Sequence, residues 1–234
     1  MSDARAAILS RLRGALQERA PFPAPPTVEQ RLPVTEVAGD RYAWLERFGQ
    51  EIVRLGGSWE YAENIATARL RLLNRLQAER VQQALAWEPE LLPLPGLQPA
   101  LADIGIELIV PDFRHGNRVS ILRQASEVDL GITGVVAALA STGTLVVRSG
   151  RGLAGLASLI TPRHLALVPM SCLYPSLEAW LAEIRASEGG RALLAEASNL
   201  TFISGPSRTS DIEMTLTLGV HGPRQVEVFF FEER

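Results

Sequence analysis

Leu165-Ala166-Leu167-Val168 is a short apolar run, bounded by His164 on one side and Pro169 on the other. A run of this kind between polar or turn-forming residues is typical of a strand that is buried on both faces. A helical pattern follows at 175–186, and another apolar run follows at 200–203. Because strands that alternate with helices require crossover connections, this stretch predicts a parallel sheet with helices on its faces.

The same alternation continues along the rest of the chain. Further expected strands are Val81–Ala86, Ile106–Val110, Thr144–Val147, Leu200–Ile203 and Val226–Phe231. The expected helices are Tyr42–Leu55, Ala62–Gln77, Pro89–Leu101, Arg118–Ala125, Gly134–Ala140, Pro175–Ala186 and Arg191–Ala197. The fold class predicted from this order is α/β, with a mainly parallel sheet and helices on both faces. Ligands of such sheets usually bind beyond the carboxyl ends of the strands.

The N-terminal part of the chain differs from this pattern. Ile8, Leu9, Leu12 and Leu16 recur at helical spacing with arginines between them, which predicts an amphipathic helix over residues 2–19. The proline run at 21–26 cannot continue a helix and favours an extended linker. We therefore predict two parts, a helical arm with its linker at 1–39 and a globular domain at 40–234.

Composition excludes several classes of chemistry. All 23 basic residues are arginine, so the chain cannot anchor pyridoxal phosphate through a Schiff base or supply the lysine of a nucleotide-hydrolysing phosphate loop. Cys172 is the single cysteine, and one thiolate cannot hold an iron–sulfur cluster or a structural zinc ion. The three histidines do not have the spacing of metal ligands. Any redox centre is expected to come from a partner.

Charge and hydrophobicity bound the partners and the location. The chain is 47% hydrophobic and 21% charged, which predicts a substantial core. A net charge of −3 without a basic tract argues against nucleic acid as a partner. No apolar stretch approaches the roughly 20 residues that cross a bilayer, and the first residues lack the layout of a secretory signal. We therefore expect a cytoplasmic protein, and a homo-oligomer is compatible with the sequence.

A polar, glycine-containing segment at 204–213 follows the expected strand Leu200–Ile203. Gly205 allows close backbone approach to a ligand, Ser207 offers a hydroxyl, and the guanidinium of Arg208 suits a carboxylate or phosphate. Ser210-x-x-Glu213 fits a capping box that would begin a helix, whereas the alternation from Ile212 to Leu218 fits a strand. The segment is either an anion site or a structural turn in which Arg208 pairs with Asp211.

A histidine lies between glycines just before the last expected strand, in Gly219-Val220-His221-Gly222-Pro223. Histidine titrates near neutral pH, so it can act as an acid, a base or a hydrogen-bond donor to a bound anion. A loop histidine can equally make a structural hydrogen bond. We take His221, Arg208, Asp211 and Glu213 as the catalytic candidates.

Two further blocks of small residues, 131–134 and 141–144, are expected to frame the short helix Gly134–Ala140. They are candidates for one wall of the site, although caps and tight turns would explain them as well. The ligand-binding candidates are Gly205, Ser207, Thr209, Ser210, Thr133, Thr142, Gly143, Thr144 and Gly222.

The segment 150–155, Gly-Arg-Gly-Leu-Ala-Gly, matches the dinucleotide-binding fingerprint. The helix that should follow is cut short at Pro162, and the acidic residue expected about twenty positions later is missing. We interpret this segment as a flexible glycine-rich loop rather than a nicotinamide or flavin site.

Taken in order, these blocks resemble a known family. The segments 131–133, 141–144, 165–169, 205–213 and 219–223 together resemble the LUD domain, and more specifically the lactate utilization protein C (LutC/YkgG) family. The most specific part is the Gly-Pro-Ser-x-Thr-x-Asp-Ile-Glu block followed by Gly-Val-His-Gly-Pro. The similarity covers about residues 40–231. One departure is Ser141, because many relatives have an acidic residue there, so the resemblance does not imply a general base at this position.

The resemblance implies a fold similar to the NagB/RpiA/CoA-transferase group. It also implies work with iron–sulfur partner proteins in the oxidation of L-lactate to pyruvate, with a small carboxylate or phosphate-bearing ligand held at the C-terminal loops. Two alternatives remain open. The chain could be a non-catalytic assembly protein that docks the iron–sulfur partners through its N-terminal helix, or a transferase or cyclo-ligase acting on an activated carboxylate.

Overall fold

The computed structural model describes residues 2–17, 37–111, 118–210, 216–218 and 222–234. The chain divides into two compact units, Met1–Val34 and Thr35–Arg234, which are considered separately. In the first unit, the helix α1 (Ser2–Gln17) exposes 59% of Ile8 and 55% of Leu12. Among the helices of the described ranges, none has the length and apolar character that a bilayer span requires.

The second unit contains the sheets and the remaining helices. Its strands are β1 (Ser58–Ala62), β2 (Gln83–Ala86), β3 (Glu107–Ile109), β4 (Leu130–Gly134), β5 (Ala137–Leu139), β6 (Thr144–Ser149), β7 (Arg163–Pro169), β8 (Leu173–Tyr174), β9 (Asn199–Ile203), β10 (Arg208–Ser210), β11 (Leu216–Leu218) and β12 (Gln225–Phe231). Its helices are α2 (Arg41–Arg54), α3 (Ile65–Ala78), α4 (Leu97–Asp103), α5 (Arg118–Glu127), α6 (Leu156–Leu159), α7 (Leu177–Ala186) and α8 (Glu188–Glu196), with short 3-10 turns η1 (Pro89–Leu91) and η2 (Met170–Cys172).

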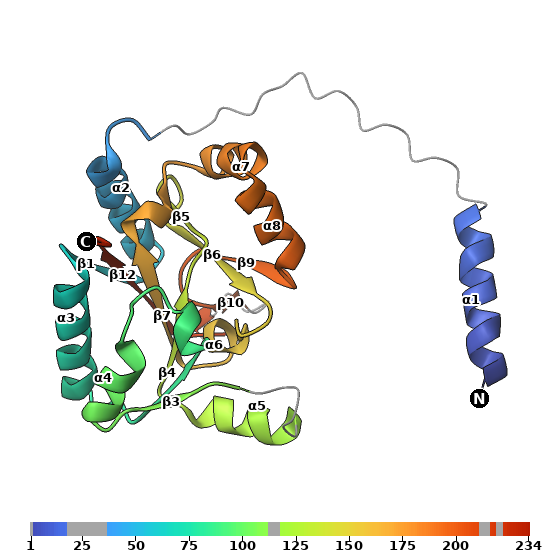
Figure 1. Ribbon diagram of the computed structural model, residues 1–234, viewed down its shortest axis with the longest axis horizontal. Coiled ribbons are helices and arrows are strands. Elements are labelled where there is room, and N and C mark those ends of the chain that lie inside the picture. The colour runs from blue at the N-terminus through green and yellow to red at the C-terminus, as the bar shows by residue number, and fades with distance from the viewer. Residues whose placement is uncertain (1, 18–36, 112–117, 211–215, 219–221) are drawn as a thin grey trace. The chain divides into compact units, whose positions relative to one another are not determined.

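The main sheet has six strands in the order β1-β12-β7-β4-β2-β3, and every neighbouring pair is parallel. The central strands β12 and β7 are buried along almost their whole length, as expected for a sheet covered on both faces. This confirms the predicted α/β class with a mainly parallel sheet (Figure 1).

Helices pack on both faces of this sheet. Phe229 of β12 lies under Arg75 of α3, with the guanidinium carbon 5.9 Å from the ring centroid. The next residue, Phe230, points to the opposite face and meets Phe48 of α2 edge to face, with centroids 5.0 Å apart. Because adjacent strand residues alternate between faces, α2 and α3 cover opposite sides of the sheet.

A second, smaller sheet packs in the same unit and was not predicted. Its order is β8-β5-β6-β9, and the pairs β5–β6 and β6–β9 are antiparallel. The expected helix Gly134–Ala140 is wrong, because this stretch forms the end of β4 and the strand β5. All three residues of β5 are buried, and an apolar run buried on both sides has no periodicity that separates a strand from a helix.

Two further expectations need correction. The outer strand β1 of the main sheet begins at Ser58, where the sequence indicated no strand. The helix expected from Ala62 begins instead at Ile65, and Asn64 caps its N-terminus. The helix expected at 89–101 is interrupted between η1 and α4. Pro93 and Pro95 cannot supply the backbone N–H groups that a continuous helix needs, and Gly96 takes a φ of 72°.

Arg80 is the one residue other than glycine with a positive φ, 57°, among the described residues. It ends α3, and the backbone N–H of Val81 donates to the carbonyl oxygen of Leu76 as helix ends with a left-handed residue commonly do. A side chain in this conformation costs about 1 kcal/mol that glycine does not pay. We expect Arg80→Gly to raise the free energy of unfolding by about 1 kcal/mol in urea titrations. An unchanged or lower value would contradict this assignment.

Candidate functional site

The segment 204–208 follows β9 and packs against the C-terminal end of α2. Gly205 has a φ of 88°, and a Cβ added there would lie 2.9 Å from the Cβ of Leu55. The guanidinium of Arg208 donates through Nη2 to the carbonyl oxygen of Leu55. The last carbonyls of a helix lack partners within the helix, and a cation near them is stabilising. Arg208 therefore has a structural role at α2, and it remains exposed.

This segment lies at the amino ends of the strands of the main sheet, whereas we expected a ligand site at their carboxyl ends. Although 204–208 follows the carboxyl end of β9, it contacts Leu55 and Gly56, which precede β1. The backbone N–H of Ser207 donates to the carbonyl oxygen of Pro223, which precedes β12. The candidate loops therefore meet at the amino ends of β1 and β12, whereas the general rule for parallel sheets favours the carboxyl ends.

The structure brings the two predicted loops together where both are described. A Cβ added to Gly222 would lie 3.1 Å from the Cβ of Ser207, which places these two candidates in contact. The catalytic candidates Asp211, Glu213 and His221 lie outside the described residues. Their roles, and the side chains of Thr209 and Ser210, stay predictions. Ser210 itself belongs to β10, which pairs antiparallel with β11.

Hydroxyl groups connect the block 141–144 to this loop. Thr142 Oγ1 lies 2.7 Å from Thr144 Oγ1, which in turn lies 2.8 Å from the hydroxyl of Ser204. A Cβ on Gly143 would lie 2.7 Å from the backbone nitrogen of Ile52. Gly143 thus packs against Glu51 and Ile52 of α2, and Gly205 packs against Leu55, which caps the same helix. The hydroxyls of Thr142, Thr144 and Ser204 lie where β6 begins and β9 ends. Of the predicted wall, Thr142, Gly143 and Thr144 adjoin the candidate loop.

A buried carboxylate beside this block was missed by sequence reasoning. Glu51 of α2 is only 5% exposed, and its two carboxylate oxygens bind Arg47 at 2.7 Å and Arg54 at 2.5 Å. The Cβ of Glu51 lies 2.9 Å from the position of a Cβ on Gly143. The signal available in the sequence was the spacing of the two arginines, four residues before and three after the glutamate, on one helix face.

Thr133 lies apart from the candidate loops, inside the main sheet. Its Oγ1 is 2.8 Å from Nε2 of His164, and both residues are completely buried. His164 pairs with Gly131 of the neighbouring strand, so their side chains share one face of the sheet. A Cβ added to Gly131 would meet the carbonyl of Ala157 in α6. The side chains of Thr133 and His164 therefore face α6. Burial lowers the pKa of His164 to about 4, because the charged imidazole would lose its hydration. Its Nδ1 has no partner among the described residues.

The buried imidazole predicts a pH dependence of stability. The pKa of His164 falls from its usual 6.5 to about 4 on folding, so the unfolded chain binds a proton between these values that the folded chain does not. Stability therefore falls as the pH drops through this window, by up to about 3 kcal/mol. We expect His164→Gln, which cannot titrate, to lose this part of the pH slope in denaturant titrations from pH 7 to 4. Identical slopes would contradict the prediction.

A charged groove of about 550 Å³ lies at the amino ends of β1 and β12 beside α3. At its base, the carboxylate of Glu227 accepts from Arg163 at 2.8 Å and faces Arg75 at 3.1 Å. Burial by itself lowers the pKa of Arg163, but its hydrogen bonds to Glu227 and Glu79 outweigh burial and raise the pKa above the usual value. Gly56 lines this groove and also contacts the guanidinium of Arg208, so the groove adjoins the candidate loop.

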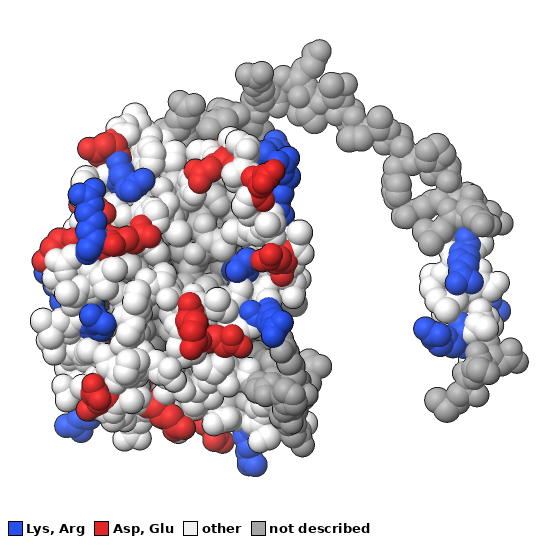
Figure 2. Space-filling view, viewed as in Figure 1, with Lys and Arg blue, Asp and Glu red and all other residues white. Residues whose placement is uncertain are grey.

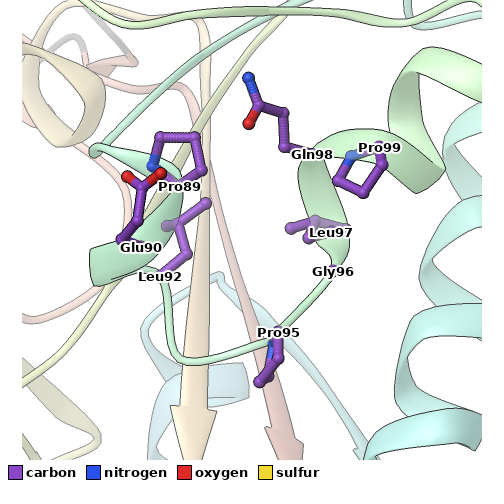
Figure 3. Close-up of a pocket in the computed structure, with 8 residues that line it drawn as sticks. All are labelled: Pro89, Glu90, Leu92, Pro95, Gly96, Leu97, Gln98 and Pro99. Atoms are coloured by element: carbon purple, nitrogen blue, oxygen red, sulfur yellow. The ribbon is translucent and has the colours of Figure 1, made fainter.

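A smaller pocket of about 300 Å³ lies between η1 and α4, on the segment that follows β2. Figure 3 shows Glu90 on one side of its opening and Gln98 on the other, with Leu92 and Leu97 lining it. Of the described residues that line it, Glu90 alone carries a charge, and Arg69 donates to the carbonyl oxygen of Pro95 at its rim. An anion in this pocket would therefore meet the carboxylate of Glu90.

On the face of the second unit that Figure 2 shows, charges of both signs are interspersed. Among the described residues, no group of three or more histidine, cysteine or acidic side chains is arranged to hold a metal ion. Cys172 is largely buried, and burial raises the pKa of its thiol to about 11, which keeps it protonated at neutral pH.

Comparison with known proteins agrees with the geometry of the fold. The family model described as the LUD domain matches residues 37–231. Lactate utilization protein C of Halalkalibacterium halodurans is 33% identical over 163 residues, which cover 69% of this chain and 67% of that protein. The protein of the same name from Bacillus subtilis is 31% identical over 113 residues, which cover 48% of this chain and 46% of that protein.

A solved structure shows the same fold. The crystal structure of a DUF162 family protein from Deinococcus radiodurans superposes with a TM-score of 0.60 over 83% of this chain and 99% of that chain, at 19% identity. At that identity the likeness concerns the fold alone. The match to the family model and the relatives above agree with the resemblance of the blocks at 131–144 and 205–223. The chain therefore belongs to the LUD domain family and, within it, groups with the lactate utilization protein C relatives.

Proposed function

We propose that this chain takes part in lactate utilization and binds a small carboxylate or phosphate-bearing ligand at the loop formed by Gly205, Ser207, Arg208 and Gly222. The names of its relatives support the first part. Iron–sulfur proteins are the proposed partners, since redox centres would come from them and not from this chain. The cytoplasmic location expected from the sequence is part of the same proposal.

The ligand assignment rests on one observation, the hydrogen bonding of the Arg208 guanidinium. Among the described residues, its guanidinium binds a neutral carbonyl oxygen, that of Leu55, and no carboxylate lies within salt-bridge distance. A guanidinium has five N–H donors. The bond to Leu55 fixes its orientation and leaves donors for a carboxylate, which arginine can bind through two parallel hydrogen bonds.

The two cavities described above are less suited to an anion. In the charged groove, Arg75 and Arg163 are already paired with three glutamates, Glu60, Glu79 and Glu227. In the pocket between η1 and α4, the charged side chain is an acid. An anion entering either cavity would meet carboxylates, whereas at Arg208 it meets an exposed cation.

Calorimetric titration of the full chain with L-lactate, pyruvate and phosphate tests this proposal. Loss of a charge-assisted hydrogen bond costs about 1.5–3 kcal/mol, so we expect Arg208→Ala to weaken binding about 10–100-fold. Arg208→Lys keeps the charge but not the fork, and should fall between the wild type and Arg208→Ala. Arg123→Ala removes another exposed arginine, on α5, whose side chain is 82% exposed, and should leave the affinity unchanged.

Thermal unfolding of each variant separates lost binding from lost folding, because Arg208 also contacts α2. Two results would contradict the assignment. In one, the wild type binds none of the three anions. In the other, folded Arg208→Ala binds them with wild-type affinity.

A docking role is a second candidate, and the exposure of α1 favours it. This helix forms its own unit and leaves more than half of Ile8 and of Leu12 exposed. An isolated helix of this length is marginally stable in water, so a partner surface would stabilise it. If the helix docks the iron–sulfur proteins, the double variant Ile8→Asp and Leu12→Asp should abolish co-purification while lactate binding is retained. Ser10→Asp is the matched control on the same helix and should co-purify normally.

A further inference from the structure

Among the described residues, none pairs with the outer side of β9, the last strand of the small sheet. Proteins usually protect outermost strands by keeping them short, by charged residues or by covering them. On the other edges of the two larger sheets, β8 has two residues, β3 has three and begins with Glu107, and β1 contains Glu60. Arg71 also donates to the carbonyl oxygen of Tyr61 in β1, at 3.0 Å. By contrast, β9 has five residues, Asn-Leu-Thr-Phe-Ile, and no charge.

One side of β9 pairs with β6 from Ser149↔Asn199 to Leu145↔Ile203. It is the last strand of its sheet, and within the described part of the chain no backbone group pairs with its other side. In Figure 1, β9 lies beyond β6 at the side of the small sheet. Its outer N–H and C=O groups therefore form a row that another strand can bind.

An apolar surface accompanies this edge. Phe202 is 49% exposed and contacts the ring of Trp180 in α7 edge to face, with centroids 6.3 Å apart. Leu200 lies on the same face of the strand, two residues away, and packs against the cluster that contains Trp180 and Ile184. A half-exposed phenylalanine beside an unpaired strand edge is a surface that a further strand would cover.

We propose that two copies of this chain associate through their β9 strands, paired antiparallel with Thr201 opposite Thr201 on a two-fold axis. Most homodimers have such an axis, and two identical strands related by an axis perpendicular to their sheet run antiparallel. In this register Leu200 of one copy faces Phe202 of the other on both sides of the axis. Pairs of aromatic and aliphatic residues at facing positions stabilise antiparallel strands.

The proposal commits to a second copy of the chain because β9 is complementary to itself. Its central residue is small and polar, an apolar residue stands on each side of it, and no charge would face a like charge across the axis. The two four-stranded sheets would join into one continuous sheet. This association is independent of the anion site at Arg208, which lies beyond the end of β9.

A disulfide placed on the axis tests the register. Facing residues of an antiparallel pair have Cα atoms about 4.5–5.5 Å apart, within the range of a disulfide. The native thiol is removed first by Cys172→Ser, since Cys172 is the single cysteine. In that background, Thr201→Cys should form a covalent dimer on mild oxidation, seen on a non-reducing gel. Leu70→Cys, at a residue of α3 that is 60% exposed, should stay monomeric.

Sedimentation equilibrium of the unmodified chain at about 100 μM tests the association itself, a concentration at which a small, specific interface is populated. We expect a mass near twice the 25.5 kDa of one chain. Phe202→Lys, a charge of the kind that protects natural edges, should shift the mass to that of one chain. Val53→Lys, at an exposed residue of α2, should sediment as the wild type.

Three results would overturn the proposal: a monomeric wild type, a Phe202→Lys variant as large as the wild type, or equal crosslinking of Thr201→Cys and Leu70→Cys. Circular dichroism checks that Phe202→Lys is folded. The comparison of Thr201→Cys with Leu70→Cys does not depend on that variant.

Discussion

We expect Glu227→Ala to lower the free energy of unfolding by about 3–5 kcal/mol, the cost of removing one member of a buried ion pair. The side chain of Glu227 is 10% exposed and bridges Arg163 and Arg75, whose side chains are each 21% exposed. Without this carboxylate, two arginines, one at the amino end of β7 and one in the last turn of α3, keep their positive charges close together and poorly hydrated. Urea titration measures the change.

The matched control is Glu196→Ala. That side chain is 72% exposed, and its carboxylate lies 3.8 Å from Arg148. Exposed pairs of this kind contribute about 0–1 kcal/mol. Equal losses in the two variants would show that the groove network has no special role in stability.

Phe230→Ala should lower the free energy of unfolding by a similar amount, about 3–5 kcal/mol. Phe230 is completely buried, and its ring contacts Phe48 of α2 at 5.0 Å and Trp59 of β1 at 6.5 Å, centroid to centroid. The substitution leaves a cavity between the sheet and α2. The candidate loop packs against the C-terminal end of this helix. Denaturant unfolding measures the loss.

Leu70→Ala serves as its control, because Leu70 is 60% exposed on α3. Removing an exposed leucine side chain changes stability by no more than about 0.5 kcal/mol. If Phe230→Ala behaved in the same way, the packing of α2 on β12 would not be the source of stability described here.

The sequence predicted the order of most elements because hydrophobic periodicity reports burial directly. The apolar run at 165–168 lies inside β7, and the run at 226–231 forms most of β12. Periodicity failed where burial is continuous, at β5, and where a strand is only partly buried, at β1. It also gave no indication that β9 belongs to a second sheet, since pairing partners are far apart in the sequence.

The candidate site was predictable in part. Residue chemistry singled out Ser207, Arg208 and Gly222, and the structure places Ser207 against Gly222 and Arg208 against α2. The contact with Leu55 joins residues 153 positions apart, so no local pattern could indicate it. Thr133 was chosen for its small size near glycines, but it lies in the sheet interior with His164.

The groove was not predicted because its charges come from four separate elements. One signal was present, a single glutamate within the apolar strand Val226-Glu227-Val228. Charged residues are rarely buried without partners, so this glutamate indicated arginines on neighbouring elements without identifying them.

A crystal of the full chain soaked with L-lactate tests the central claim most directly. We predict that the lactate carboxylate lies within hydrogen-bond distance, about 2.7–3.2 Å, of the Arg208 guanidinium, next to Ser207 and Gly222. Lactate bound instead at the carboxyl ends of the main sheet or among the glutamates of the groove, with Arg208 contacting only Leu55, would contradict it.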